Sequence, residues 1–191
     1  MSLSYAPAAM TLVIPWSPAR LTLAIRRRWD GSACADPRLH ARVTLSARAP
    51  GLSIEGRLPD PAPERLPDAP VGERVADLWH YDVVECFLVG KGGRYLEVEL
   101  GAGGHFLVLS FDAPRVLADD RAQLRPRVAH QRDGRGWRTA LTLPWDCVPA
   151  GVCGLNAFVS ARGEHLAWAP LPGVAPDFHQ PARYPRARLS R

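Results

Sequence analysis

The chain has 191 residues, of which 47% are hydrophobic and 23% charged, a composition typical of a globular protein with one core. The formal net charge is +5, but the basic residues are scattered along the chain, which argues against nucleic acid as a partner. No apolar stretch reaches the roughly 18 residues of a membrane-spanning helix, so no membrane partner is expected. We therefore expect a single domain over residues 1–191, with residues 1–9 disordered.

Residue usage also suggests where the protein occurs. Of the 24 basic residues only Lys91 is a lysine, and Ala, Pro and Gly are plentiful; like Arg, these have GC-rich codons. This bias predicts a bacterial protein. The N-terminal stretch lacks the positive segment and unbroken apolar segment of a signal peptide, so a cytoplasmic location is expected. Either Met1 or Met10 is compatible with the start of translation.

The four cysteines, Cys34, Cys86, Cys147 and Cys153, form neither a C-x-x-C pair nor a zinc-binding spacing. A bridge between Cys147 and Cys153 is compatible with their separation. In a cytoplasmic protein, however, all four are expected to be reduced. We expect no metal and no cofactor.

Short runs of alternating apolar and polar residues, separated by Gly, Pro and Asp, dominate the chain. The main strand-forming runs are 38–48, 78–90, 94–100, 105–112, 124–131, 137–144 and 155–170. Turn segments, GAGG, RDGRG and RGE, join some of them as hairpins. About ten strand candidates with almost no helix predict an all-β protein, an antiparallel sandwich or barrel.

Two long segments do not fit this alternation. Residues 57–77 contain five prolines and cannot lie inside a sheet, so they are expected to form a long loop. Residues 169–185 form a second long loop. Long loops in compact domains are often functional.

The run LWHYDVVECFLVG, residues 78–90, is apolar on both faces and yet carries two carboxylates. In one continuous strand Trp79, Tyr81 and Glu85 would share a face, and Asp82 would lie on the other. A Trp beside a carboxylate suits sugar recognition, because the indole stacks on a sugar ring and the carboxylate accepts hydrogen bonds from hydroxyls. The alternative places both aromatics in the core and pairs Glu85 with an arginine. Asp82 is expected to accept a hydrogen bond from a loop amide or an arginine.

The motif DLWHYDVVECFL, followed by RYLEVEL and a glycine turn, resembles the W-x-x-D-x-x-E-x-F core of the DOMON-like superfamily. Within it the nearest group is the family 9 carbohydrate-binding modules. Similar segments follow in the same order: WRTALTLPW, GLNAFVSAR and LAWAPLPGVAPDFHQPARYPRARL. The resemblance covers roughly residues 20 to 189. It implies an antiparallel β-sandwich of the DOMON-like or jelly-roll type, with a sugar clamped between two aromatic side chains.

The resemblance also implies site residues. Trp79 matches the motif Trp and Glu85 its hydroxyl-binding glutamate, while Asn156 lies on a late strand that contributes a polar contact. Arg162 is expected to flank the same pocket. Where sugar-binding members carry an arginine on the strand after the motif, this chain has Glu97, which replaces a donor with a second acid.

The second aromatic of the clamp is less directly indicated, and Trp16 and Trp29 are the candidates near the N-terminus. Members of the family often hold structural calcium, but no dense Asp/Asn loop here resembles such a site.

Three functions are compatible with these residues. We expect a non-catalytic module that binds a sugar or another small polar molecule. An alternative is a protein-interaction domain that has lost sugar binding and contacts a protein partner through the proline-rich loop. The third is a hydrolase that uses Glu85 and Glu97, which would require His165 or His179 in the same cleft and would raise one carboxyl pKa.

Overall fold

The computed structural model describes residues 11–190; the expectations for residues 1–9 and for a start at Met1 or Met10 lie outside this range. The strands are β1 (Leu12–Ile14), β2 (Leu21–Ala24), β3 (Arg27–Arg28), β4 (Arg42–Arg48), β5 (Gly51–Leu58), β6 (Val83–Val89), β7 (Tyr95–Gly101), β8 (Phe106–Ala113), β9 (Val116–Asp119), β10 (Val128–Asp133), β11 (Gly136–Pro144), β12 (Gly154–Ala161), β13 (Glu164–Ala167) and β14 (Ala187–Leu189). Helical structure in the described residues is confined to four three-residue 3-10 turns, η1 (Pro37–Leu39), η2 (Leu78–His80), η3 (Lys91–Gly93) and η4 (Pro181–Arg183). No helix among residues 11–190 is long and apolar enough to cross a membrane.

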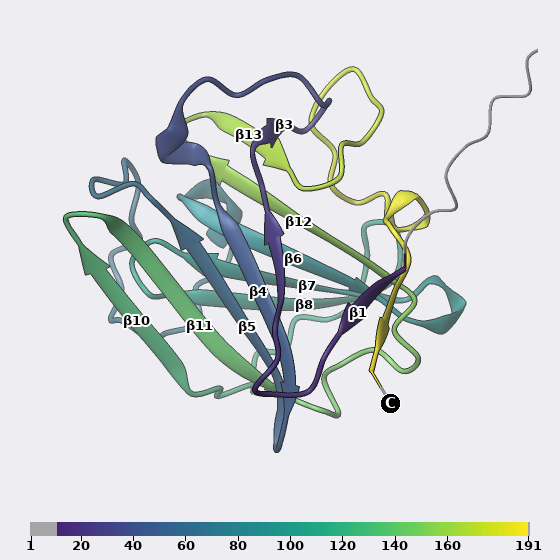
Figure 1. The fold of residues 1–191 in the computed structure, drawn as a ribbon. Coiled ribbons are helices and arrows are strands. Elements are labelled where there is room, and N and C mark those ends of the chain that lie inside the picture. Colours follow the sequence, from purple (N-terminus) through teal and green to yellow (C-terminus); the bar gives the residue numbers. More distant parts are fainter. Residues whose placement is uncertain (1–10, 191) are drawn as a thin grey trace, which may run out of the picture.

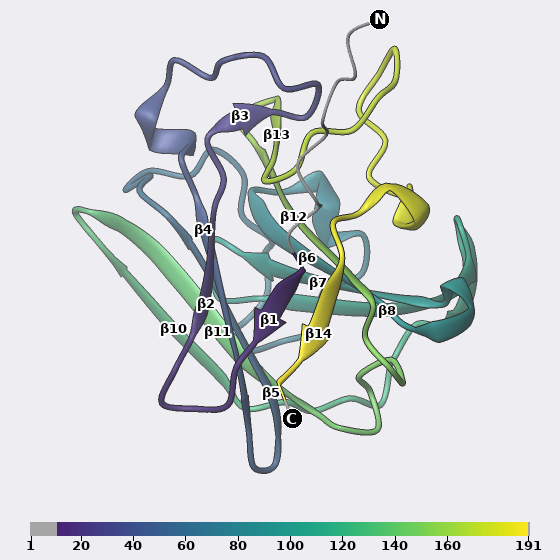
Figure 2. The same cartoon turned by 45° about the vertical axis from the view of Figure 1, so that its right-hand side comes forward.

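Two antiparallel sheets make up most of the fold, which confirms the predicted β-sandwich. The five-stranded sheet has the order β10-β11-β5-β4-β2 and lies in front of the seven-stranded sheet in Figure 1. The seven-stranded sheet has the order β3-β13-β12-β6-β7-β8-β9. The hairpins expected from the turn segments are all present, as β7–β8, β10–β11 and β12–β13. A separate parallel pair joins β1 to β14, and Figure 2 shows these two strands side by side.

The main core lies between the two sheets. The position of β6 between this core and a second apolar cluster explains why the sequence of β6 is apolar on both faces. Val84, Cys86 and Leu88 belong to the main core cluster. Val83, Phe87 and Val89 belong to a second cluster on the opposite side of the seven-stranded sheet, which we call its outer face. Every residue of β6 is buried, as expected for a central strand covered on both sides.

The segment between β13 and β14, drawn in yellow-green to yellow in Figures 1 and 2, packs against the outer face, and we call it the covering segment. Leu171, Phe178 and Tyr184 from this segment pack in the second cluster. The Tyr184 hydroxyl donates a hydrogen bond to the Phe178 carbonyl oxygen, and this bond joins two parts of the same segment. This cover makes the outer face a second apolar layer rather than a solvated surface.

The prediction that residues 78–90 form one strand is wrong at its beginning. Leu78–His80 form the 3-10 turn η2, and β6 starts only at Val83. Asp77 adopts a left-handed backbone conformation with φ 53°, and the backbone amide of His80 donates to its carbonyl oxygen. Trp79 therefore precedes the strand and does not share one of its faces with Glu85.

The cysteines are all free, as expected for a reduced protein: Cys34, Cys86 and Cys147 are buried and Cys153 is exposed.

Candidate functional site

Three glutamates lie together on the outer face of the seven-stranded sheet. Antiparallel pairing of β6 with β7 sets Glu85 opposite Glu99, and it sets Phe87 opposite Glu97. Because side chains alternate along a strand, all three carboxylates point the same way, together with Phe87. Their relative exposures are 3% for Glu85, 4% for Glu97 and 0% for Glu99.

Glu85 and Glu97 line a cavity of about 530 Å³ between this face and the covering segment. Three further polar side chains line the cavity: Ser160 from β12, His165 from β13 and His179 from the covering segment. The apolar walls are Leu109, Phe111, Leu117, Pro176 and Phe178. Trp79 and Arg115 complete the lining. A cavity of this size with convergent polar groups is typical of small-molecule sites.

Glu85 is held by a neutral partner rather than by a cation. The Ser160 hydroxyl donates to Glu85 Oε1 at 2.8 Å, and His165 Nδ1 lies 3.3 Å from the same hydroxyl. Burial raises the pKa of Glu85 to about 7, although the Ser160 hydrogen bond acts in the opposite direction. The alternative prediction of an arginine pair at Glu85 is therefore wrong, since its hydrogen-bond donor is Ser160.

Glu97 and Glu99 are strongly perturbed as well. Burial, followed by the nearby Glu85 charge, raises the pKa of Glu97 well above its usual value, while Arg115 acts in the opposite direction. Burial also raises the pKa of Glu99, with Glu85 and Glu97 adding to the effect. Neither carboxyl oxygen of Glu99 has a hydrogen-bond partner among residues 11–190. Three carboxyls this close cannot all ionise without a cation among them.

His179 approaches Glu97 without pairing with it. Its Nε2 lies 3.9 Å from Glu97 Oε2, and its Nδ1 lies 2.7 Å from the Tyr95 hydroxyl. The Tyr95 hydroxyl accepts a hydrogen bond from the Arg115 backbone amide, so its own proton is available for His179 Nδ1. Burial lowers the pKa of His179 to about 4, so the imidazole is neutral at pH 7 and does not neutralise Glu97.

Apart from its histidines, the cavity is lined by three aromatic side chains, Trp79, Phe111 and Phe178. Trp79 is 42% exposed. Phe178 stacks on Phe158 with ring centroids 4.1 Å apart. The sequence analysis did not name Phe178 as a site residue, although it lies in a long loop and in the C-terminal segment that resembles family 9 modules. The candidates Trp16 and Trp29 do not line the cavity.

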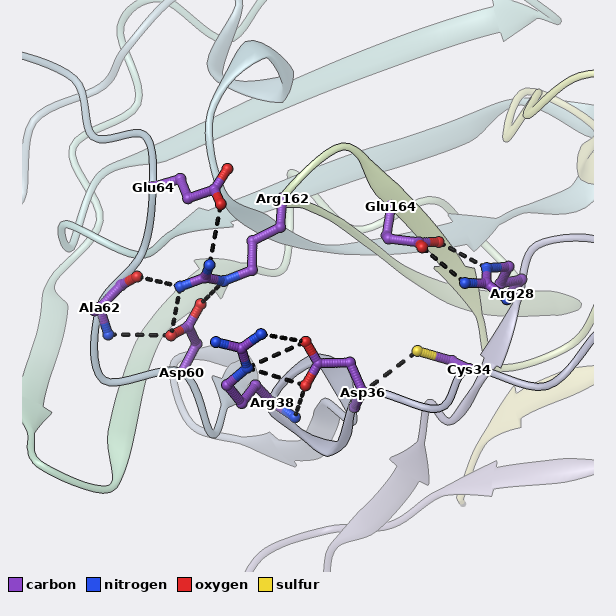
Figure 3. Close-up of polar contacts among 9 residues, drawn as sticks. All are labelled: Arg28, Cys34, Asp36, Arg38, Asp60, Ala62, Glu64, Arg162 and Glu164. Carbon is purple, nitrogen blue, oxygen red and sulfur yellow. Dashed lines mark hydrogen bonds and ion pairs between the residues drawn. The ribbon is translucent and has the colours of Figure 1, made fainter.

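Asn156 and Arg162 are not brought to the cavity. Asn156 is fully buried; its Nδ2 donates to the Ala169 carbonyl oxygen at 2.9 Å and its Oδ1 accepts from the Ala169 amide at 3.0 Å. Arg162 points to the loop after β5, where its Nε donates to Asp60 Oδ2 at 2.6 Å and its Nη1 donates to Glu64 Oε1 at 3.0 Å (Figure 3). Both side chains hold backbone segments in place.

Asp82 has the structural environment expected from the sequence. It is 2% exposed and accepts backbone hydrogen bonds from Glu64 at 2.7 Å and Arg162 at 3.3 Å. It thereby fixes the proline-rich loop, whose irregular part spans residues 59–77, to the β12–β13 turn.

Similar folds occur among solved structures of sugar-binding proteins. A candidate carbohydrate-binding protein from Bacteroides uniformis superposes with a TM-score of 0.69 at 13% identity, covering 96% of this chain and 100% of that one. A family 9 carbohydrate-binding module from Caldicellulosiruptor kristjanssonii, solved with cellotriose, gives a TM-score of 0.63 at 15% identity, covering 94% of this chain and 93% of the module. Its complex with glucose gives 0.61 at 14% identity, covering 95% and 96%. The fold is therefore like that of family 9 modules, as the sequence motifs implied.

Comparison with models of known protein families gives no match. The rat UPF0462 protein C4orf33 homolog is 32% identical over 154 residues, which cover 73% of this chain and 74% of the rat protein. The human UPF0462 protein C4orf33 is 30% identical over 169 residues, covering 81% of each. Mouse and zebrafish proteins of the same name also match. These relatives are vertebrate, so the prediction of a bacterial protein is wrong: a bias toward Arg, Ala, Pro and Gly does not identify a lineage. The chain belongs to the UPF0462 family.

Proposed function

We propose that the cavity on the outer face binds a small sugar without transforming it. The observation that carries this proposal is the position of the half-exposed Trp79 beside a cavity that Glu85 and Glu97 also line. An indole offers a flat apolar surface for the C–H face of a sugar ring. Buried carboxyls next to it can exchange hydrogen bonds with hydroxyl groups, and their desolvation makes the loss of such bonds costly.

The structural neighbours support the same ligand class. The family 9 module from Caldicellulosiruptor kristjanssonii was solved with cellotriose and with glucose. In this chain a ring bound against Trp79 would have Phe111 and Phe178 as further aromatic side chains of the same cavity. The wider relation to the DOMON-like superfamily, the single domain and the cytoplasmic location stay predictions from the sequence.

Calorimetric titration with glucose and cellotriose tests the proposal, with Trp79→Ala and Glu85→Gln as variants. Losing the indole should weaken binding at least about tenfold, because stacking contributes beyond simple area burial. Trp16→Ala is the matched control, since that indole is 47% exposed and lies outside the cavity. Saturable binding that only the cavity variants weaken supports the proposal. No binding of either sugar rejects it in favour of a protein-interaction domain, and equal weakening by the control places the site elsewhere.

A hydrolase is the second candidate, and one observation favours it. Glu85, Glu97, His165 and His179 line one cavity, which is the arrangement that an enzyme at this site would require. Glu85 and Glu97 are diagonal neighbours on paired strands, which lie roughly 7–8 Å apart with their Cβ atoms somewhat closer. Two carboxyls carried this way on one face can work together as the acid and base of a glycosidase. Turnover of aryl glycosides that Glu85→Gln abolishes would establish the hydrolase, and bound sugar recovered intact would exclude it.

A further inference from the structure

Glu97 is a buried acceptor that receives no hydrogen bond from the described part of the chain. Its side chain lines the cavity and is 4% exposed, and its pKa is set by burial and by the Glu85 and Arg115 charges, with no hydrogen bond from residues 11–190 among the causes. The nearest basic group is His179 Nε2, at 3.9 Å. A buried carboxyl without a partner is costly, so its presence at a cavity points to a donor that arrives with the ligand.

The cavity also lacks an available cation among its described residues. Arg115 is bound to Asp177, with its Nη2 2.8 Å from Asp177 Oδ1. Burial lowers the pKa values of both His165 and His179, so they are neutral at pH 7. Glu85 has only the uncharged hydroxyl of Ser160 as its donor.

A third acidic side chain lies behind the cavity wall. Glu99 lies on β7 two residues after Glu97, faces the same side of the sheet and is fully buried. Its two carboxyl oxygens have no hydrogen-bond partner in the described part of the chain. Glu85 lies directly opposite Glu99 on β6, so three carboxyls are grouped at this site. A cationic group in the cavity would favour their ionised forms and would be attracted by them.

We propose that the ligand is an amino sugar whose protonated amine donates to Glu97, a refinement that rests on the sugar-binding function proposed above. An ammonium group has three donors and no acceptor, so it can bond both Glu97 and Glu85. Charge-assisted bonds of this kind are roughly twice as strong as neutral ones. Phe111 and Phe178 in the walls add aromatic faces that attract a cation. A metal ion is a poorer candidate, because residues 11–190 contain no group of three or more His, Cys, Asp or Glu placed to hold one.

Calorimetric titration at pH 7 with glucose, glucosamine, N-acetylglucosamine and ethanolamine tests the proposal. These probes separate the hydroxylated ring from the charged amine, since acetylation removes the charge and ethanolamine lacks the ring. Glucosamine should bind at least about tenfold more tightly than glucose, in line with the strength of a charge-assisted hydrogen bond. In Glu97→Gln this preference should vanish, so that glucosamine and glucose bind the variant with equal affinity. Glu73→Gln is the matched control, because that side chain is exposed and lies outside the cavity.

The outcomes separate the two proposals. Equal binding of glucose and glucosamine overturns the amine proposal and leaves sugar binding intact. Ethanolamine binding without sugar binding, abolished in Glu97→Gln, overturns the sugar and supports the amine site. A glucosamine preference that persists in Glu97→Gln overturns the role of Glu97. If no probe binds the wild-type protein, both proposals fail.

Discussion

Replacing Glu85 by Gln should make the protein more stable at neutral pH. In the folded protein burial raises the pKa of this carboxyl to about 7, from an ordinary value of 4.5. At 1.36 kcal/mol per pKa unit, the difference corresponds to about 3 kcal/mol. Gln does not titrate, and its amide oxygen can still accept the hydrogen bond from Ser160.

The sign follows from proton binding in the two states. Between pH 4.5 and 7 the unfolded chain has lost the Glu85 proton while the folded protein still holds it. The unfolded state thus binds fewer protons, and the wild-type free energy of unfolding falls as pH rises. The free energy of unfolding of Glu85→Gln does not fall in this way, because Gln does not titrate. In the variant, Glu97 and Glu99 also no longer lie beside an ionised Glu85, which acts in the same direction.

Urea denaturation followed by tryptophan fluorescence, at pH 4.5, 6, 7 and 8, measures this effect. The difference between Glu85→Gln and wild type should be small at pH 4.5 and approach about 3 kcal/mol by pH 8. The exposed Glu73 supplies a control, Glu73→Gln, for which little change is expected. A difference that stays constant with pH, or a variant less stable than wild type at pH 8, would refute the assignment of Glu85 as a buried carboxyl without a cation.

Three further substitutions test the framework around the site. Arg162→Ala should lower the free energy of unfolding by about 3 kcal/mol, because the Asp60 side chain, 1% exposed, loses its ion pair; an unchanged urea midpoint would contradict this. Asn156→Ala should cost about 1–3 kcal/mol and speed proteolysis of the covering segment, whose anchor it removes; equal cleavage rates in variant and wild type would argue against that anchor. Gly51→Ala should cost more than about 4 kcal/mol, since the new Cβ would lie 1.8 Å from the Leu143 carbonyl oxygen; a wild-type circular dichroism melt would show that β5 and β11 can separate.

Much of the fold could be predicted because local pattern and tertiary burial agree. In β7 and β8 the alternation, the glycine turn and the antiparallel pairing all indicate the same hairpin. The same alternation predicted that Glu85 and Glu97 could face one pocket, because side-chain direction along a regular strand follows directly from position. The face of the sheet on which each side chain lies can thus be predicted from the sequence wherever a strand is regular.

The rest of the site could not be predicted because it lies outside regular strands. Trp79 reaches the cavity from a 3-10 turn, so the strand argument placed it there for the wrong reason. Phe178 lies in an irregular segment that has no period to interpret. Asn156 and Arg162 show the converse difficulty: a polar side chain in a sequence does not reveal whether its partner is a ligand or the protein's own backbone and loops.

The parallel pairing of β1 with β14 has a consequence for synthesis. Leu12 pairs with Ala187, so about 175 residues separate the two halves of this ladder. At about 5–20 residues per second, β1 leaves the ribosome roughly 10–35 s before its partner exists. During that interval Leu12 and Ile14, which are 6% and 0% exposed in the folded protein, have no strand to pair with. Until β14 has been synthesised, the nascent chain should therefore present the apolar segment Leu12–Ile14 to chaperones.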